Sequence, residues 1–354
     1  MAPLRYLTLP SNPSSLLPKF PSYTCATHVQ TALQQEFLAW KARAPSARGP
    51  PPPPSVLCFT PSPTYTLGRR QTEPLSEPEV ARLRSPLFVS GAHESDSNNS
   101  DDGRDGTGRP GKAGFFLPTI THAPRGGLTT YHGPGQLVIW PVIDLHSPLH
   151  AHLSVRDYAC LLEKTTIATL ERMWGLAGFT TENPGVWVRR SGGSRGAGGE
   201  GEGGGGGGGG GGDAGGDERK IAALGVHLRR HVTGLGVAIN YSTPVSGPAE
   251  INPWGRIVAC GLGDREVTSV RAELGVRGSS NSISQENDDH MALQGLGETW
   301  RAEFQKRLKF REDADTMVAS DTPESMKYLS AQLEQLKDTD GLQVEARPFS
   351  ALET

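Results

Sequence analysis

The segment from Arg125 to Gln136 concentrates residues that can do chemistry, in the order Arg-Gly-Gly-Leu-Thr-Thr-Tyr-His-Gly-Pro-Gly-Gln. Glycine lets backbone N–H groups approach a ligand without an intervening Cβ, and the proline between two glycines restricts the loop. Such a segment could cradle an acyl chain or direct donors at a carbonyl oxygen. A tight turn around a buried arginine is the alternative, and a single glycine-rich motif does not decide between the two.

Two further segments carry a potential base and a potential nucleophile. Lys220 opens a regular stretch soon after a glycine tract, and Cys260 ends an apolar run directly before Gly261. A cysteine beside valine and alanine is usually a buried inert thiol, and a lysine at a strand end is usually solvated. Cys260 becomes a credible nucleophile if a cation or base within reach lowers the pKa of its thiol.

The elements that must position these residues alternate between helices and strands. Ser154 with Asp157 predicts a capped helix start and Gly175 its end. Further helices are expected over 25–44, 291–309 and 323–337, and strands over 4–9, 55–59, 65–67, 136–142, 185–189, 220–231 and 235–241. Strands outnumber helices and the order is mixed, which favours an α+β fold with a mixed β-sheet packed against helices.

Four low-complexity segments are expected to be disordered inserts. They cover about 45–54, which ends in five prolines, 91–114, 191–218 with an unbroken glycine run, and 277–291. Long surface insertions cost little because closure entropy grows with the logarithm of loop length. Residues 1–310 are therefore expected to form one interrupted domain, followed by a helical extension over 311–354.

Charge and cysteine content exclude several classes of protein. The chain has 35 basic and 38 acidic residues, which does not suggest a nucleic-acid partner. No apolar run approaches the roughly 18 residues of a membrane span, so a membrane partner is not expected. The four cysteines form no CxxC pair, which disfavours a zinc site or a disulfide scaffold. No metal or cofactor is expected.

Taken in order, Arg125–Gln136, Lys220–Gly225 and Cys260-Gly261 resemble the octanoyltransferases of lipoic acid synthesis. The similarity extends to Tyr65–Arg70 and Gly236–Asn240, and covers most of the ordered chain from about residue 4 to 275. It implies the α+β fold shared with biotin and lipoate protein ligases. It also implies transfer of an octanoyl group from acyl carrier protein to a lysine of lipoyl domains.

The same resemblance assigns roles to individual residues. Cys260 would carry the acyl thioester, and Lys220 would lie beside it, lower the pKa of the thiol and accept a proton. His132 could donate to the thioester oxygen or hold the loop, and substrate positioning is favoured. The implied substrate site consists of Arg125, Gly126, Gly127, Leu128, Thr129, Thr130, Tyr131, His132, Ala223, Leu224, Gly225, Gly236, Val237 and Ala238.

Three positions depart from the family pattern. Leu235 and Pro61 stand where the family often has histidines, and Ala259 stands where it commonly has proline. None of these changes removes the nucleophile or the lysine. A supporting histidine role cannot be assigned to these positions.

Three alternative functions remain to be weighed. An ATP-dependent lipoate or biotin ligase on the same fold would form an adenylate and would not need Cys260. A non-catalytic protein that binds acyl carrier protein or lipoyl domains would transfer nothing, and a cysteine hydrolase would release free octanoate. The motif combination favours the transferase over all three.

The resemblance also implies partners and a location. Octanoyl-acyl carrier protein would be the donor, and lipoyl domains of 2-oxoacid dehydrogenase complexes and glycine cleavage H protein the acceptors. Both partners are typically acidic, so basic residues could form a docking rim: Arg69, Arg70, Arg189, Arg190, Arg229 and Arg230. The inserts suggest a eukaryotic protein, in which this activity is mitochondrial. The acid-poor N-terminus suits either a transit peptide or a strand of the fold.

Overall fold

A mixed sheet runs through the centre of the computed structural model, which describes residues 4–9, 20–89, 115–190, 218–257, 265–275, 283–317 and 345–346. Its strand order is β12-β10-β11-β8-β2-β1-β13, and β9 also pairs with β10. The bounds are β1 Arg5–Thr8, β2 Ser55–Phe59, β8 Gln136–Val142, β9 Gly185–Arg189, β10 Glu218–Arg229, β11 Val232–Asn240, β12 Glu266–Val267 and β13 Glu345–Ala346. The pairs β1–β2 and β10–β12 are parallel, and the other pairs of this sheet are antiparallel.

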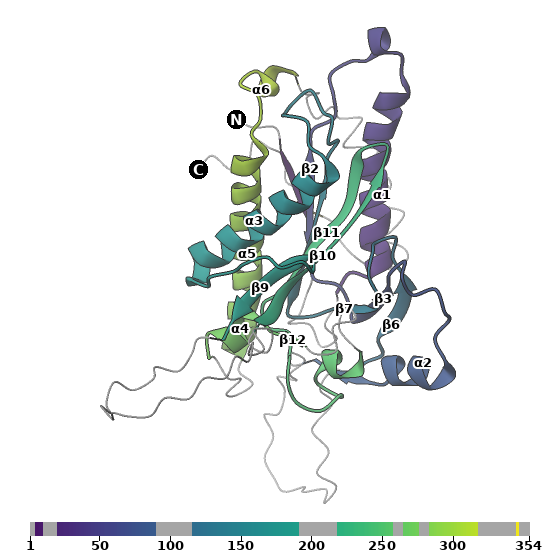
Figure 1. Ribbon diagram of the computed structural model, residues 1–354, viewed down its shortest axis with the longest axis vertical. Coiled ribbons are helices and arrows are strands. Elements are labelled where there is room, and N and C mark those ends of the chain that lie inside the picture. The colour runs from purple at the N-terminus through teal and green to yellow at the C-terminus, as the bar shows by residue number, and fades with distance from the viewer. Residues whose placement is uncertain are drawn as a thin grey trace, which may run out of the picture.

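Helices cover both faces of this sheet (Figure 1). On one face lie α3, Val155–Trp174, and α5, Ile283–Leu308. Their side chains share a core with alternate residues of β8 and β11, among them Ile139 and Ile239. On the other face lies α1, Tyr23–Ala42, which packs on Val138 and Trp140. The sheet is therefore buried on both sides over its central strands, which explains the continuous apolar run of β8.

A smaller sheet and a short helix complete the described fold beside one end of α1 (Figure 1). The small sheet has the order β6-β3-β7. Its strands are β3 Thr64–Leu67, β6 Thr119–His122 and β7 Thr130–His132, and near it lie α2 Glu77–Arg84 and the strand pair β4 Leu87–Phe88 and β5 Phe115–Phe116. The remaining short elements are η1 Pro45–Ala47, η2 Pro253–Arg256, α4 Val270–Glu273 and α6 Ala314–Met317.

Local signals in the sequence account for the best-defined helix. The Ser154 hydroxyl accepts from the Asp157 N–H, and the Asp157 carboxylate accepts from the Ser154 N–H, which completes the expected capping box. Gly175 ends the helix in a left-handed conformation with φ of 65°. The strands expected over 55–59, 136–142 and 185–189 are confirmed with the same bounds.

Three expectations about the inserts need correction. Residues 45–54 are not solvated throughout: 45–50 are exposed except for a partly buried Arg48, but Pro51, Pro53 and Pro54 are buried and the Pro54 carbonyl accepts from the Arg5 N–H. The polar stretch assigned to 277–291 is helical from Ile283 onward, since it forms the first turns of α5. The extension over 311–354 is not helical throughout, since β13 pairs with β1.

Other expectations about these regions fall outside the described residues. They are the inserts expected over 91–114 and 191–218 and the helix expected over 323–337. Of these residues only Glu218 is described, as the first residue of β10. Among the described helices, none combines the length and apolar character that a bilayer span requires. The described residues also hold no group of three His, Cys, Asp or Glu side chains placed to ligate a metal.

Candidate active site

A cavity opens on the α1 face of the sheet because small residues face one another across β10 and β11. The antiparallel register pairs Ala223 with Ala238 and Gly225 with Gly236. These pairs leave a hollow that larger side chains would fill, and all four residues line the cavity. The empty space is about 410 Å³, part of it open to solvent.

Arg125 closes one side of the cavity and is committed to the loop that carries it. Its side chain is 8% exposed, and its carbon stem lies over Gly225, where an added Cβ would come within 2.8 Å of Arg125 Cδ. Nη1 donates to the carbonyls of Gly126 and Leu128 at 3.0 and 2.9 Å, and Nη2 donates to the carbonyl of Thr66 at 2.7 Å. The buried-arginine turn considered from the sequence is therefore present, and the same residue also lines the cavity.

The Arg-Gly-Gly turn is held against the residues that follow β3. Backbone N–H groups of Gly68, Arg69 and Arg70 donate to the carbonyls of Leu128, Arg125 and Gly127. Gly68 is required at this contact, because an added Cβ would overlap the Gly127 carbonyl oxygen. The two motifs that are 60 residues apart in the sequence therefore form one wall.

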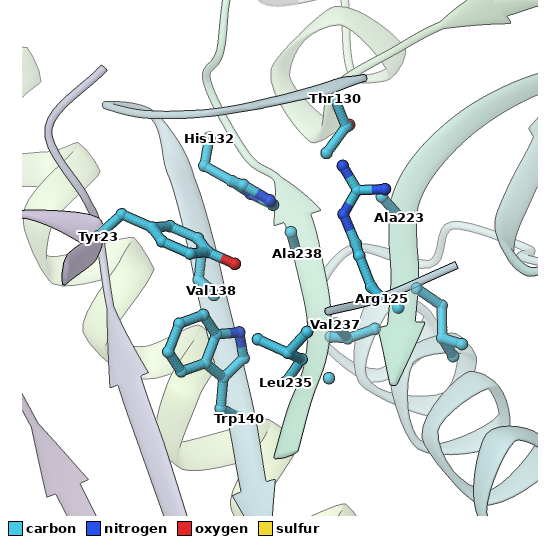
Figure 2. Close-up of a pocket in the computed structure, with 13 residues that line it drawn as sticks. Tyr23, Arg125, Thr130, His132, Val138, Trp140, Ala223, Leu235, Val237 and Ala238 are labelled. Carbon is cyan, nitrogen blue, oxygen red and sulfur yellow. The ribbon is translucent and has the colours of Figure 1, made fainter. Parts of the chain in front are cut away.

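His132 and Tyr23 reach into the cavity from the side opposite Arg125 (Figure 2). Their rings stack with centroids 5.4 Å apart at 25°. Nδ1 of His132 hydrogen-bonds to Oε1 of Gln136 at 2.8 Å. Burial lowers the pKa of His132 to about 4, an effect that the hydrogen bond to Gln136 partly opposes. Burial raises the pKa of Tyr23, which keeps its hydroxyl protonated.

The remaining walls are apolar. Val138 and Trp140 project from β8 on its α1 face, and Trp140 packs edge-on against Tyr23 with centroids 5.2 Å apart. Leu235 adds its side chain from β11 in a left-handed conformation with φ of 59°, and its N–H donates to Gln30 Oε1 at 2.5 Å. That conformation costs a residue with a Cβ roughly 1–2 kcal/mol, and the hydrogen bond to buried Gln30 offsets part of the cost.

Lys220 is buried in the first half of β10, outside this set of lining residues. Its side chain is 7% exposed, and Nζ lies 5.0 Å from the centroid of the Trp187 ring. Burial raises the pKa of nearby Glu163, and the Gly185 N–H and the charge of Lys220 act in the opposite direction.

Cys260 and Gly261 lie outside the described residues. The described chain resumes at Arg265, whose guanidinium carbon lies 5.2 Å from the same Trp187 ring.

The structure brings together nine of the fourteen residues expected to line the substrate site: Arg125, Thr130, His132, Ala223, Leu224, Gly225, Gly236, Val237 and Ala238. Gly126, Gly127, Leu128 and Thr129 are not among the lining residues and build the supporting turn. Tyr131 points the other way on β7 and packs in a core with Tyr65 and Trp254.

Sequence reasoning missed four lining residues, Tyr23, Val138, Trp140 and Leu235. Val138 and Trp140 carried a readable signal, because alternate residues of a strand share a face and this strand directly follows the motif. Tyr23 comes from the start of a separate helix, and nothing local in the sequence links it to His132.

Comparison with known proteins identifies the chain. Residues 119–291 match the lipoyl protein ligase A/B catalytic domain. A probable octanoyltransferase of Schizosaccharomyces pombe is 30% identical over 250 residues, which cover 71% of this chain and 80% of that protein. The chain belongs to the octanoyltransferase family. It is an acyltransferase of that type, and its mixed sheet between helices is the expected α+β fold, over which the lipoyl protein ligase A/B catalytic domain matches.

Other octanoyltransferases match over shorter spans. A mitochondrial octanoyl-acyl-carrier-protein:protein N-octanoyltransferase of Xenopus tropicalis is 37% identical over 43% of this chain and 47% of its own length, so the alignment spans about half of that relative. Among solved structures, a bipartite lipoate protein ligase of Thermoplasma acidophilum aligns over 95% of this chain and 93% of its own, with 13% identity and a TM-score of 0.48.

Proposed function

We propose that this octanoyltransferase moves an octanoyl group from octanoyl-acyl carrier protein to a lysine of lipoyl domains, through a thioester on Cys260. The observation that carries the proposal is the cavity itself. Its floor consists of small residues in register, its walls are largely apolar, and the His132 ring enters from the side opposite Arg125. An unbranched acyl chain suits the apolar part.

The proposed chemistry has two steps of different energetics. Exchange of the acyl group from one thioester to another is nearly balanced, and transfer from Cys260 to an amine then runs downhill to an amide. In the first step the Cys260 thiol attacks, Lys220 takes its proton, and the proton returns to the departing thiolate of the carrier. A cation beside a thiol lowers its pKa and favours the thiolate. Arg265 follows Cys260 by five residues and shares the Trp187 ring with Lys220, which supports this pairing.

Cys25 and Cys58, in the described part of the chain, are poor candidates for the residue that holds the acyl group. Cys25 and Cys58 are buried, and burial raises the pKa of Cys58 to about 12. A thiol with that pKa supplies almost no thiolate at neutral pH. Cys160 on α3 is only partly buried, so it offers a matched control for the nucleophile.

We propose a basic rim as the docking surface for the acidic partners. Arg69 and Arg229 both lie close enough to His227 for their charges to lower its pKa, although burial is the larger cause. His227 follows the cavity residue Gly225 by two positions on β10, so the three basic residues lie beyond one end of the cavity. Arg189 is less available, because it stacks on Phe179 and lies 3.6 Å from Glu218.

We also propose a mitochondrial location and lipoyl domains of 2-oxoacid dehydrogenase complexes and glycine cleavage H protein as acceptors. Named octanoyltransferases of Xenopus tropicalis and Danio rerio are mitochondrial, while other relatives are bacterial. Imaging of the full chain with a C-terminal fluorescent tag tests the location, and a diffuse signal would contradict it.

The test of the reaction is the intact-protein mass after mixing with octanoyl-acyl carrier protein in the absence of ATP. The wild-type protein and Cys160→Ser should each gain one thiol-labile octanoyl group, and Cys260→Ser should gain none. The adduct should disappear when an apo lipoyl domain is added, and the mass should appear on that domain. No adduct and no labelled domain would overturn the transferase proposal, and labelling that requires ATP would indicate a ligase.

A further inference from the structure

Lys220 packs between Trp187 and Gly185 of the neighbouring strand. β9 and β10 run side by side (Figure 1), and their register places Lys220 directly opposite Trp187. Side chains directly opposite on antiparallel strands are neighbours, and Nζ of Lys220 lies 5.0 Å from the centroid of the Trp187 ring. An added Cβ at Gly185 would lie 2.6 Å from Lys220 Cε, so the glycine leaves room for the lysine stem.

The Trp187 ring is fixed by contacts of its own. The side chain is fully buried, and its Nε1 donates to the carbonyl oxygen of Asn183 at 3.1 Å. The backbone N–H and carbonyl of Trp187 both pair with Phe179, each at 2.9 Å. The ring is therefore a rigid surface against which the lysine side chain packs.

The described carboxylates around Lys220 have other partners. Glu163 of α3 accepts from the Gly185 N–H at 3.0 Å. It is near enough for the charge of Lys220 to lower its pKa, although burial is the larger effect and raises that pKa. The acids on the adjoining segments pair with arginines or are exposed: Glu182 and Glu218 with Arg265, Glu273 with Arg219, and Glu266. In the described part of the chain, no carboxylate lies within 4.0 Å of Lys220 Nζ.

The Trp187 ring is thus the described group in direct contact that favours the charged form of Lys220. Burial removes water from an ammonium and disfavours its charge. A cation over the face of a tryptophan is attracted by the ring, and more strongly where water is excluded. The guanidinium carbon of Arg265 lies 5.2 Å from the same ring centroid, and its like charge acts against that of Lys220.

We propose that Trp187 is a positioning residue for the acylation step: its ring holds the lysine ammonium and thereby sets the pH above which Lys220 accepts the thiol proton. The inference rests on the proposed function, in which Lys220 is that acceptor. The proton leaves the Cys260 sulfur for the neutral amine, and the thiolate forms a bond to the carbonyl carbon of the donor thioester. The carbon–sulfur bond of the donor breaks, and the ammonium returns the proton to the departing thiolate of the carrier.

Substitution of the ring tests this role. Trp187→Phe keeps a weaker aromatic face, Trp187→Leu removes it, and Trp300→Phe is the matched control. Trp300 is also fully buried and its Nε1 also donates to one oxygen, Thr166 Oγ1 at 3.0 Å, but it lies in the core between α3 and α5.

Two measurements are made on each protein. Single-turnover acylation by octanoyl-acyl carrier protein is followed by intact-protein mass from about pH 6 to 10, the range below the ordinary lysine titration. The titration of Lys220 is followed separately by NMR of protein labelled at the lysine ε-carbons. Its signal is assigned by its absence in Lys220→Arg.

Both midpoints should move to lower pH, because an ammonium without the ring is less stable and loses its proton more readily. We expect a fall of roughly 0.5 pH unit in Trp187→Phe and roughly 1 pH unit or more in Trp187→Leu. Trp300→Phe should keep the wild-type midpoints. Wild-type midpoints in Trp187→Leu, or an equal shift in Trp300→Phe, would overturn the assignment. Should Trp187→Leu fail to fold, Trp187→Phe is judged by the same two midpoints.

The outcome for the wild-type protein separates this inference from the function on which it rests. A wild-type protein that forms no octanoyl adduct overturns the proposed reaction, and the part of Trp187 in it falls as well. A wild-type protein that forms the adduct, together with a Trp187→Leu variant that keeps both midpoints, overturns only the role of Trp187.

Discussion

Arg125 Nη2 donates to both the carbonyl oxygen and the hydroxyl of Thr66, at 2.7 and 2.8 Å. Thr66 belongs to β3, whereas Arg125 opens the motif that leads into β7, so this fork ties the motif to the small sheet. With the two bonds from Nη1, the guanidinium satisfies three carbonyl oxygens and one hydroxyl. The arginine of this motif is thus first a clamp for the loop, and its carbon stem is what faces the cavity.

Arg125→Lys should lower the free energy of unfolding by about 3 kcal/mol. Lysine cannot reproduce the planar fork, and each lost hydrogen bond to a charged group contributes roughly 1.5–3 kcal/mol. Urea unfolding measures the change. Arg69→Lys, at an exposed arginine two residues after β3, is the control and should shift stability by less than about 0.5 kcal/mol. An Arg125→Lys protein as stable as wild type would show that the clamp contributes little.

Gly185→Ala should displace the Lys220 side chain and strain the backbone between β9 and β10. Gly185 has φ of 129°, and an added Cβ would lie 2.5 Å from the Ala222 carbonyl oxygen and 2.6 Å from Lys220 Cε. The lysine side chain must then shift relative to the Trp187 ring. A catalytic group displaced by about 1 Å can cost up to about 10²-fold in rate, so we expect acylation to slow by roughly 10- to 100-fold in single-turnover assays. Gly49→Ala, where a Cβ meets nothing within 4 Å, is the control. Normal acylation by Gly185→Ala would argue against a catalytic role for Lys220.

Much of the fold could be predicted from local patterns, but the cavity could not. The capping box at Ser154 and the apolar run of β8 depend on neighbours in the sequence, and both were read correctly. The pairing of Ala223 with Ala238 depends on the turn between β10 and β11. This register has no local signature in these residues, so the small side chains gave no sign of a shared hollow.

Residues of the site that come from distant elements show the same limit. Tyr23 stacks on His132 only because α1 crosses the sheet at β8, and this crossing is a property of tertiary packing. Leu235 was expected in a strand, at a position where the family often has a histidine, yet it adopts positive φ and its N–H donates to Gln30 of α1. The motif residues identified the region of the site, but Tyr23 and Gln30 of α1, which contact His132 and Leu235, belong to no motif.

Leu235→Ala should relax the acyl-chain length that the enzyme accepts. The Leu235 side chain is 3% exposed and closes part of the cavity wall, so shortening it enlarges the apolar end. One methylene in a hydrophobic pocket changes specificity by roughly 10-fold or more. We expect the ratio of kcat/KM for dodecanoyl- over octanoyl-acyl carrier protein to rise at least about tenfold.

A buried leucine outside the cavity separates this effect from loss of stability. Leu83 of α2 is 2% exposed and packs in the small-sheet core. Leu83→Ala should lower the free energy of unfolding by about 2–5 kcal/mol and leave the chain-length ratio unchanged. An unchanged ratio in Leu235→Ala would show that this wall does not meet the acyl chain.

The buried neutral state of His132 makes the stability of the protein depend on pH in a defined window. The pKa of His132 is about 4 in the folded protein, and an unperturbed histidine titrates near 6.5. Between these values the unfolded chain binds a proton at this position and the folded protein does not. Its contribution is therefore fully present above about pH 6.5 and is lost as the pH falls towards 4.

Comparison of wild type with His132→Asn isolates that contribution, since His150 and the other titratable groups are present in both proteins. Urea unfolding at pH 7 and at pH 4.5 should show that the free energy of unfolding of the wild type falls by roughly 2–3 kcal/mol more than that of the variant. The sign of this difference between the two proteins is decisive. An exposed histidine would give no difference, and a histidine paired with a carboxylate would make the free energy of unfolding of the wild type fall less than that of the variant. Equal falls in the two proteins would mean that His132 is not held neutral, and its Nε2 would then be protonated part of the time at working pH.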